Sequence, residues 1–151
     1  MKTIERTLDA EAIKKILSTD NLYDSLVFDG SPSLEDYVPD VVNKVSFILK
    51  EDTQIAGMIF LDYMNYVLWT PHIFIFEKFR GNGSEEWGKQ VVKYMLDRCR
   101  PIKFLAFTPY NAAKAYAERV GFKNIAVLKN SVKKGGQILN QYMLELDGEE
   151  E

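Results

Sequence analysis

A basic, glycine-containing turn between an expected strand and an expected helix constrains this chain more than any other feature. The turn comprises Arg80, Gly81, Asn82, Gly83 and Ser84. The apolar, aromatic residues 67–76 before it indicate a strand, and residues 85–98 after it indicate a helix. The N–H groups of such a turn point outward, and the helix N-terminus adds partial positive charge. The segment therefore predicts a site for a phosphate-bearing ligand, with a solvated glycine-rich turn as the plain alternative.

Two common phosphate-binding motifs do not match this turn. A P-loop requires a lysine followed by serine or threonine, and no such pair lies near Gly83. A dinucleotide fingerprint requires a third glycine at the position where this sequence has Glu86. Neither of these two modes of phosphate binding is therefore expected.

A second motif lies downstream, in residues 109–122. Asn111 is placed to cap a helix by accepting a hydrogen bond from a first-turn N–H. The apolar face of this helix, at i, i+3, i+4 and i+7, consists of Ala113, Tyr116, Ala117 and Val120. Gly121 suits the left-handed position after the helix, and Phe122 begins the next strand.

Together the two motifs resemble those of the GNAT superfamily of acyl-CoA-dependent N-acyltransferases. That family carries R-x-x-G-x-G/A after its fourth strand, and the corresponding stretch here is residues 80–85. It also carries an N-x-x-A…G-F helix after its fifth strand, which corresponds here to residues 111–122. The order and spacing of the elements match over most of the chain. The helix and the C-terminal hairpin also resemble those of small bacteriophage-encoded GNAT-like proteins.

The resemblance implies an α/β (α+β) fold, with a mixed, mostly antiparallel sheet flanked by helices. The expected strands cover residues 3–7, 45–50, 54–63, 66–76, 102–108, 125–132 and 137–146. Asp9 and Asp20 are candidate caps of two helices near the N-terminus. Pro71 cannot donate to a strand ladder and predicts a bulge or an unpaired stretch. That stretch is compatible with the family's fourth strand, which splays away from the fifth to admit the acyl-CoA arm.

Length and charge limit the remaining possibilities. The 151 residues suit one domain, expected over residues 1–146, with an acidic tail at 147–151. The net charge of -3 argues against a nucleic-acid surface. Short apolar runs argue against a membrane span, and the N-terminus does not resemble a signal peptide. With a single cysteine, Cys99, a cytoplasmic protein is the expectation. No metal site is expected, and the oligomeric state, including a homodimer, is left open.

The resemblance implies acetyl-CoA (CoA) as the cofactor. Arg80 and the backbone amides of Gly81, Asn82, Gly83 and Ser84 would hold the pyrophosphate. Asn111 matches a position that often contacts the pantetheine arm, and this role is compatible with a helix cap. The strand backbone at Ile73 and Ile75 would pair with the pantetheine amides. Glu85 departs from the family's Gly or Ala and would oppose phosphate binding unless its carboxylate turns outward.

The acid and the base of the reaction are less clearly marked. Many relatives carry a tyrosine, which protonates the leaving thiolate, at the position that is Ala117 here. Tyr116 is the neighbouring candidate, with core packing as its alternative role. His72 is the candidate base, because imidazole changes charge near neutral pH, with a structural or solvent-facing histidine as the alternative. Acidic residues that could attract a cationic amine are Glu35, Asp36, Asp40 and Asp62.

The function predicted from these features is an acetyl-CoA-dependent N-acetyltransferase. Its acceptor would be a primary amine of a small molecule or of a protein. The alternative is a catalytically degenerate GNAT-like protein with a CoA-binding or structural role. Ala117 and Glu85 are the two residues that favour this alternative.

Overall fold

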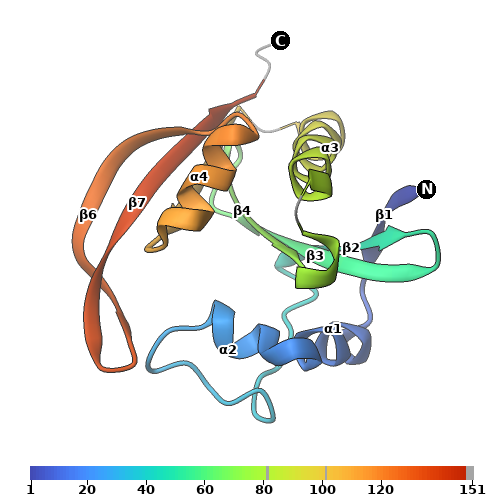
Figure 1. Ribbon diagram of the computed structural model, residues 1–151, viewed down its shortest axis with the longest axis horizontal. Coiled ribbons are helices and arrows are strands. Elements are labelled where there is room, and N and C mark those ends of the chain that lie inside the picture. The colour runs from blue at the N-terminus through green and yellow to red at the C-terminus, as the bar shows by residue number, and fades with distance from the viewer. Residues whose placement is uncertain (81, 101, 149–151) are drawn as a thin grey trace.

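Seven strands form one mixed sheet in the computed structural model, which describes residues 1–80, 82–100 and 102–148 (Figure 1). The strands are β1 (Lys2–Thr7), β2 (Lys44–Glu51), β3 (Gln54–Tyr63), β4 (Leu68–Ile75), β5 (Lys103–Thr108), β6 (Lys123–Lys134) and β7 (Gln137–Asp147). Their order is β1-β2-β3-β4-β5-β7-β6, and each neighbouring pair is antiparallel except β4 with β5. The expected mixed, mostly antiparallel sheet is confirmed. Gly81 of the predicted turn and residues 149–151 of the predicted tail lie outside the described residues.

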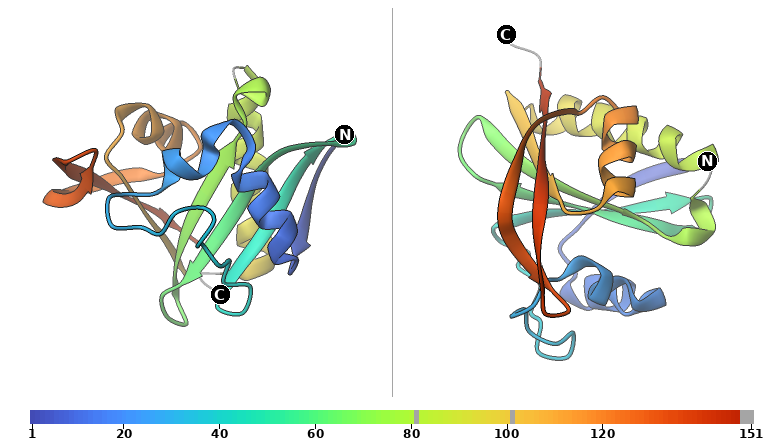
Figure 2. Two further views of the ribbon diagram at one scale, coloured as in Figure 1. Left: turned by 90° about the horizontal axis from the view of Figure 1, so that it is seen from below. Right: turned by 60° about the vertical axis from the view of Figure 1, so that its left-hand side comes forward.

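Helices cover both faces of this sheet, as Figures 1 and 2 show. They are α1 (Ala10–Leu17), α2 (Leu22–Leu26), α3 (Asn82–Cys99) and α4 (Asn111–Arg119), with short 3-10 turns at Thr19–Asn21 and Glu77–Phe79. The first two helices lie on one face, and α3 and α4 lie on the other. No helix in the described part of the chain has both the length and the apolar character needed to cross a bilayer.

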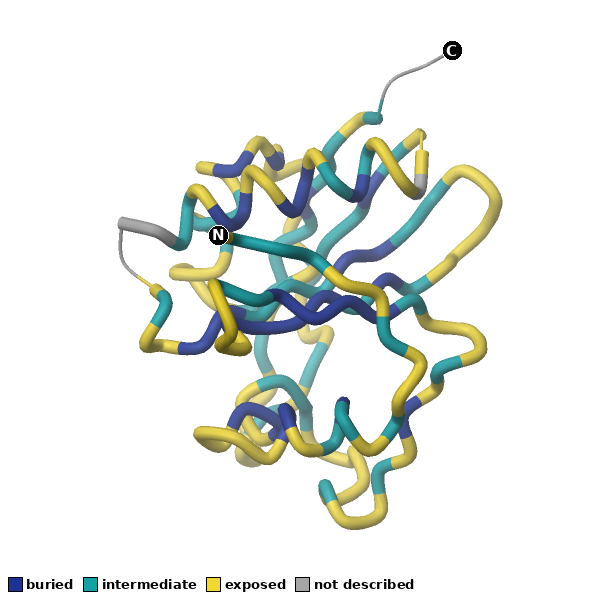
Figure 3. The backbone as a smooth tube through the Cα atoms, turned by 90° about the vertical axis from the view of Figure 1, so that its right-hand side faces the viewer, coloured by how far each residue is buried: buried dark blue, intermediate teal, exposed yellow. Residues whose placement is uncertain are grey.

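Each face of the sheet has its own apolar core (Figure 3). The core under α1 and α2 includes Ile13, Ile16, Leu17, Leu22, Ile48 and Met58. The core under α3 and α4 includes Phe47, Ile59, Trp87, Val91, Met95 and Phe104. The residues of α3 recur at helical spacing, so they place one stripe against the sheet. The two layers therefore hold the middle strands from both sides.

The predicted helix caps near the N-terminus differ in outcome. Asp9 caps α1, because its carboxylate accepts from the backbone N–H groups of Glu11 and Ala12. Asp20 does not cap α2, so that prediction is wrong. Asp20 has a φ of 53°, and the cap position of α2 is taken by Asn21, which makes no side-chain cap hydrogen bond. The left-handed backbone here joins two short helices whose positions are set by packing on the sheet.

Helix α4 begins differently from the prediction and ends as predicted. Asn111 is its first residue rather than its cap, and the cap position belongs to Tyr110. At the other end Gly121 has a φ of +114°, a conformation that favours glycine. The N–H of Phe122 donates to the Ala117 carbonyl oxygen at 2.9 Å, which closes a Schellman turn. The chain is thereby directed into β6.

The β6–β7 hairpin extends from the sheet and contacts the segment after α2. Its turn is at Gly135 and Gly136, with φ values of 58° and 81°. The carboxylate of Asp29 accepts from both glycine N–H groups, at 2.9 and 2.8 Å. Lys134 donates to the carbonyl oxygens of Asp24 and Val27. The hairpin and the α2 segment therefore enclose the space between them.

Candidate active site

Strands β4 and β5 separate soon after they begin. Within the described residues they pair only at residues 68–69 and 103–104, whereas the other edge of β4 stays paired with β3 through Ile75. The register between β3 and β4 is continuous, so the bulge predicted at Pro71 is wrong. The alternative of an unpaired stretch is confirmed, on the side of β4 that faces β5.

The open edge of β4 presents backbone groups to the gap. The N–H of Phe76 donates to the Ala56 carbonyl oxygen, in the direction of β3. Alternate residues point the other way, so Ile73 and Ile75 direct their backbone groups toward the gap. The backbone of Pro71 points in the same direction as that of Ile73 and Ile75. The N–H group that a proline lacks would therefore have faced the gap and not β3. This explains how β4 accommodates a proline without losing a hydrogen bond to β3.

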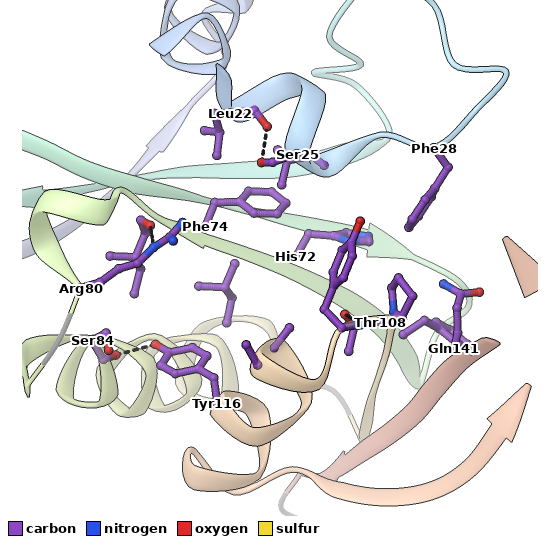
Figure 4. A pocket seen from close by; sticks show the side chains of 18 of the residues that line it. Leu22, Ser25, Phe28, His72, Phe74, Arg80, Ser84, Thr108, Tyr116 and Gln141 are labelled. Atoms are coloured by element: carbon purple, nitrogen blue, oxygen red, sulfur yellow. Dashed lines mark hydrogen bonds between the residues drawn. The ribbon is translucent and has the colours of Figure 1, made fainter. Parts of the chain in front are cut away.

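A cavity of about 1020 Å³ passes through this gap (Figure 4). At its α3 end, Figure 4 shows Arg80, Ser84 and Tyr116. At its α2 end, Figure 4 shows Phe28, His72, Thr108 and Gln141. The other lining residues are Leu22, Ser25, Leu26, Ile73, Phe74, Ile75, Phe107, Pro109, Tyr110, Ala112, Ala113, Arg119, Leu128 and Ser131. The sheet is therefore traversed by one continuous space with chemically different ends.

The α3 end carries the predicted anion-binding arginine. Arg80 Nε donates to the Ile75 carbonyl oxygen at 2.8 Å, which holds the guanidinium beside the open edge of β4. This bond uses one of the five donors of the group. Helix α3 starts two residues later, at Asn82, and its first-turn N–H groups have no acceptors within the helix itself. The Arg80 guanidinium and the N-terminus of α3 therefore lie close together, as the sequence of the turn predicted.

Tyr116 also lies at the α3 end, where it joins α4 to α3. Its hydroxyl donates to the Ser84 carbonyl oxygen at 2.5 Å. A Cβ atom at Gly88 would lie 2.5 Å from that hydroxyl oxygen, so the two helices pack closely here. Burial raises the pKa of Tyr116 to about 12. The core packing considered for Tyr116 is observed, and its catalytic role stays a prediction.

Two further charges lie near this end. Glu85 does not line the cavity but pairs with Lys89, with Oε1 and Nζ 3.0 Å apart. The Lys89 hydrogen bond lowers the pKa of the Glu85 carboxyl. Arg119 lines the cavity with its guanidinium 5.9 Å from the centre of the Tyr116 ring. The sequence offered no signal for Arg119, since its proximity to α3 depends on how the two helices pack.

The α2 end is marked by a histidine paired with a carboxylate. Asp62 of β3 lies opposite Thr70, two residues before His72, so both side chains share one face of the sheet. Nε2 of His72 is 2.9 Å from Oδ2 of Asp62, and Nζ of Lys44 is 3.3 Å from Oδ1. The hydrogen bond from His72 is the main cause that lowers the pKa of the Asp62 carboxyl. The sequence carries no local sign of this pairing, because the pairing depends on the register between β3 and β4.

The remaining predicted site residues are distributed differently. The backbone of Asn82 and Gly83 forms the first turn of α3. Asn111 does not line the cavity, because its Oδ1 accepts from the Tyr142 hydroxyl. Its contact with a pantetheine arm stays a prediction, as do those of the β4 backbone. Among the described residues, no three His, Cys, Asp or Glu side chains gather closely enough to bind a metal ion.

The acidic residues considered for attracting an amine do not face the cavity. Asp36 is hydrogen bonded to Ser33, and Asp40 accepts from the backbone N–H groups that follow it. Glu35 lies on an exposed segment and is not among the lining residues. No aspartate or glutamate is present among the described residues that line the cavity.

Solved structures with the same overall architecture are numerous, although their sequences are distant. No family model matches the sequence, and no curated protein matches it significantly. Spermidine N-acetyltransferase from Vibrio cholerae, solved with CoA and spermine, aligns with a TM-score of 0.75 at 14% identity, over 97% of this chain and 95% of that one. The yncA protein of Salmonella typhimurium, a putative acetyltransferase solved with acetyl-CoA, aligns with a TM-score of 0.72 at 17% identity. The alignment covers 99% of this chain and 95% of that one.

An N-acetyltransferase from Staphylococcus aureus Mu50 aligns with a TM-score of 0.70 at 16% identity, over 97% of both chains. The alignments span nearly the full length of each partner, so the similarity extends over almost the whole fold. At these identities the likeness establishes the fold and not the substrate. The chain therefore has the GNAT fold of these acetyltransferases.

Proposed function

We propose that this protein is an acetyl-CoA-dependent N-acetyltransferase that acetylates a primary amine. The observation that carries the proposal is the cavity through the β4–β5 gap, with Arg80 at one end and His72 at the other. The solved structures with CoA or acetyl-CoA support it, since they have the same fold. Acetyl-CoA would supply the acetyl group as a reactive thioester.

The residues of the α3 end suit the diphosphate of CoA. Arg80 supplies a cation, and the N-terminus of α3 supplies backbone donors with partial positive charge. Arg119 adds a second cation beside Tyr116. Glu85 opposes this charge less than expected, because Lys89 pairs with its carboxylate. The open backbone at Ile73 suits the amides of the pantetheine arm.

His72 is proposed as the group that receives the amine proton. Its Nε2 faces the Asp62 carboxylate, so the proton on Nε2 is held there and Nδ1 is the nitrogen able to accept another. The amine nitrogen forms a C–N bond with the acetyl carbon as the thioester C–S bond breaks. The amine proton passes to His72, and the departing thiolate takes a proton from water. The proton path thus needs no tyrosine acid.

A CoA-binding protein without turnover is the second candidate. It would be favoured over an enzyme that depends on Tyr116 as its acid, because that hydroxyl is engaged with α3 and its pKa is raised. Such a protein would bind CoA at the α3 end just as the enzyme would, but it would not transfer the acetyl group of acetyl-CoA to an amine. Turnover therefore distinguishes the two.

The test combines calorimetry of CoA binding with an assay of free thiol released from acetyl-CoA in the presence of amines. Binding together with amine-dependent thiol release is the expected result. Binding without thiol release across a broad amine panel would support the second candidate. If the protein does not bind CoA at millimolar concentration, both the acetyltransferase and the CoA-binding protein without turnover are excluded.

A further inference from the structure

The α2 end of the cavity is lined by uncharged groups apart from His72. Apolar and aromatic side chains there belong to Leu26, Phe28, Phe107, Tyr110 and Leu128. The polar members are the neutral side chains of Ser25, Ser131 and Gln141. Figure 4 shows Phe28 and Gln141 on the side of His72 that is away from Arg80. An acceptor bound here would contact mainly apolar surface.

Three carboxylates on the elements around this end are not part of its lining. Asp62 is held between His72 and Lys44. Asp29 accepts from both N–H groups of the hairpin turn. Asp24 lies on the exposed side of α2, since Leu22, Ser25 and Leu26 form the side that lines the cavity. Each of these acids is therefore outside the surface that an acceptor would touch.

This distribution of charge selects between classes of amine. A polyamine keeps positive charges on its distal nitrogens after one nitrogen has lost its proton, and these charges need carboxylates when they leave water. The described lining offers none. A monoamine has no charge left once its nitrogen is neutral, and an attached apolar group gains by leaving water.

The β6–β7 hairpin and the segment after α2 border this end on one side. Contacts of Asp29 and Lys134 join the hairpin to the segment after α2. Figure 1 shows the end of the hairpin beside that segment, on the far side of α2 from α1. The acceptor would share the cavity of about 1020 Å³ with the arm of the cofactor, which leaves room for a small molecule.

From these observations we infer that the acceptor is a small monoamine bearing an aromatic or apolar group. The inference rests on the proposed acetyl transfer and names the substrate class of the same cavity. The reaction is the one given above, in which the neutral amine nitrogen forms the amide bond, His72 takes its proton, and CoA leaves as the thiol. The aromatic group of the acceptor would lie between Phe28 and Leu128, away from Arg80.

The test compares phenethylamine with spermidine as acceptors for the native protein at saturating acetyl-CoA. We expect kcat/KM for phenethylamine to exceed that for spermidine by at least about tenfold, the range in which apolar pocket contacts discriminate. A higher kcat/KM for spermidine would overturn the inference and leave the acetyltransferase activity intact. Absence of thiol release with every amine would overturn the proposed function as well.

A second experiment introduces a negative charge into the cavity lining. Ser131→Asp places a carboxylate at the α2 end and should shift the ratio of kcat/KM toward spermidine by about tenfold or more. Ser31→Asp adds the same charge on the exposed segment outside the cavity and should leave the ratio unchanged. An equal shift in both variants, or none in Ser131→Asp, would contradict a specificity set by the lining.

Discussion

Nε2 of His72 lies 2.9 Å from Oδ2 of Asp62, and the two residues reach each other diagonally across β3 and β4. This contact engages Nε2 of the imidazole, so Nδ1 is the other ring nitrogen that could accept a proton. It also means that the candidate base comes with a carboxylate that can stabilise its protonated form.

His72→Gln should lower kcat/KM by roughly ten- to a hundredfold and abolish the rise of activity with pH that a general base produces. Asp62→Asn should act in the same direction, because it removes the group that orients the imidazole. The check is a pH–rate profile of each variant with a good amine. Asp40→Asn, a change of the same kind outside the cavity, is the control. A native profile that follows the titration of the amine substrate, unchanged in His72→Gln, would show that water takes the proton.

Removing the imidazole should also change how Asp62 titrates. The hydrogen bond from His72 is the largest cause of the lowered pKa of Asp62, so His72→Leu should raise that pKa toward its ordinary value. The stabilisation that this carboxylate contributes is present above the ordinary carboxyl range and is lost as pH falls through the lowered pKa. In His72→Leu this loss should move to higher pH. Carbon-detected NMR of the Asp62 carboxyl measures the shift directly, and an unchanged titration would contradict the pairing.

Arg80→Ala should weaken CoA binding by about 1–3 kcal/mol, the range for a lost charge-assisted hydrogen bond. Binding to the native protein should also weaken as salt rises, since phosphates contribute much of the affinity. Calorimetry at two salt concentrations provides both measurements. Arg6→Ala changes an exposed arginine on β1, at the opposite edge of the sheet from the hairpin, and should have no effect. Equal affinities for Arg80→Ala and Arg6→Ala would place the phosphates elsewhere.

Tyr116→Phe should lower stability by about 0.5–1.5 kcal/mol, because the hydroxyl loses its hydrogen bond to the Ser84 carbonyl oxygen. The turnover rate should change little, since a hydroxyl with a pKa of about 12 that is engaged with α3 is a poor proton donor. Chemical denaturation and steady-state kinetics test the two parts. A loss of roughly ten- to a hundredfold in kcat with unchanged stability would instead identify Tyr116 as the acid.

Asp29→Asn should loosen the hairpin from the α2 segment. The N–H groups of Gly136 and Gly135 lower the pKa of Asp29, so its stabilising effect is present above the ordinary carboxyl range. It is lost as pH falls through the lowered pKa. The protection of the two glycine amides, measured relative to their intrinsic exchange rates at each pH, should therefore fall in the variant at neutral pH and in the native protein in acid. Asp24→Asn, which leaves these N–H groups bonded, should exchange like the native protein.

Thr70→Val should maintain or raise stability. Thr70 is 6% exposed, and its Oγ1 has no hydrogen-bond partner among the residues that the structure describes. An unsatisfied buried hydroxyl costs about 1–3 kcal/mol, which valine of similar shape avoids. Thermal unfolding of the two proteins provides the comparison. A marked loss of stability would indicate that a water bonds to this hydroxyl.

The elements governed by local pattern could be predicted from the sequence. The strand expected over residues 54–63 is β3, the expected cap Asp9 begins α1, and the Gly121–Phe122 pair ends α4 as predicted. The turn after Arg80 likewise predicted a helix terminus beside a cation. These features depend on backbone preferences and on hydrogen bonds between residues close in the sequence.

The functional contacts were decided by the tertiary structure. Asp62 meets His72 through the β3–β4 register, Asn111 meets Tyr142 rather than capping its helix, and Arg119 reaches the cavity through helix packing. A one-residue slip of a strand would reverse the face of its side chains, so a sequence pattern alone cannot name such partners. The sequence determined which elements form and where the anion site begins. The packing of those elements decided which charges face the cavity, because that depends on contacts between residues far apart in the chain.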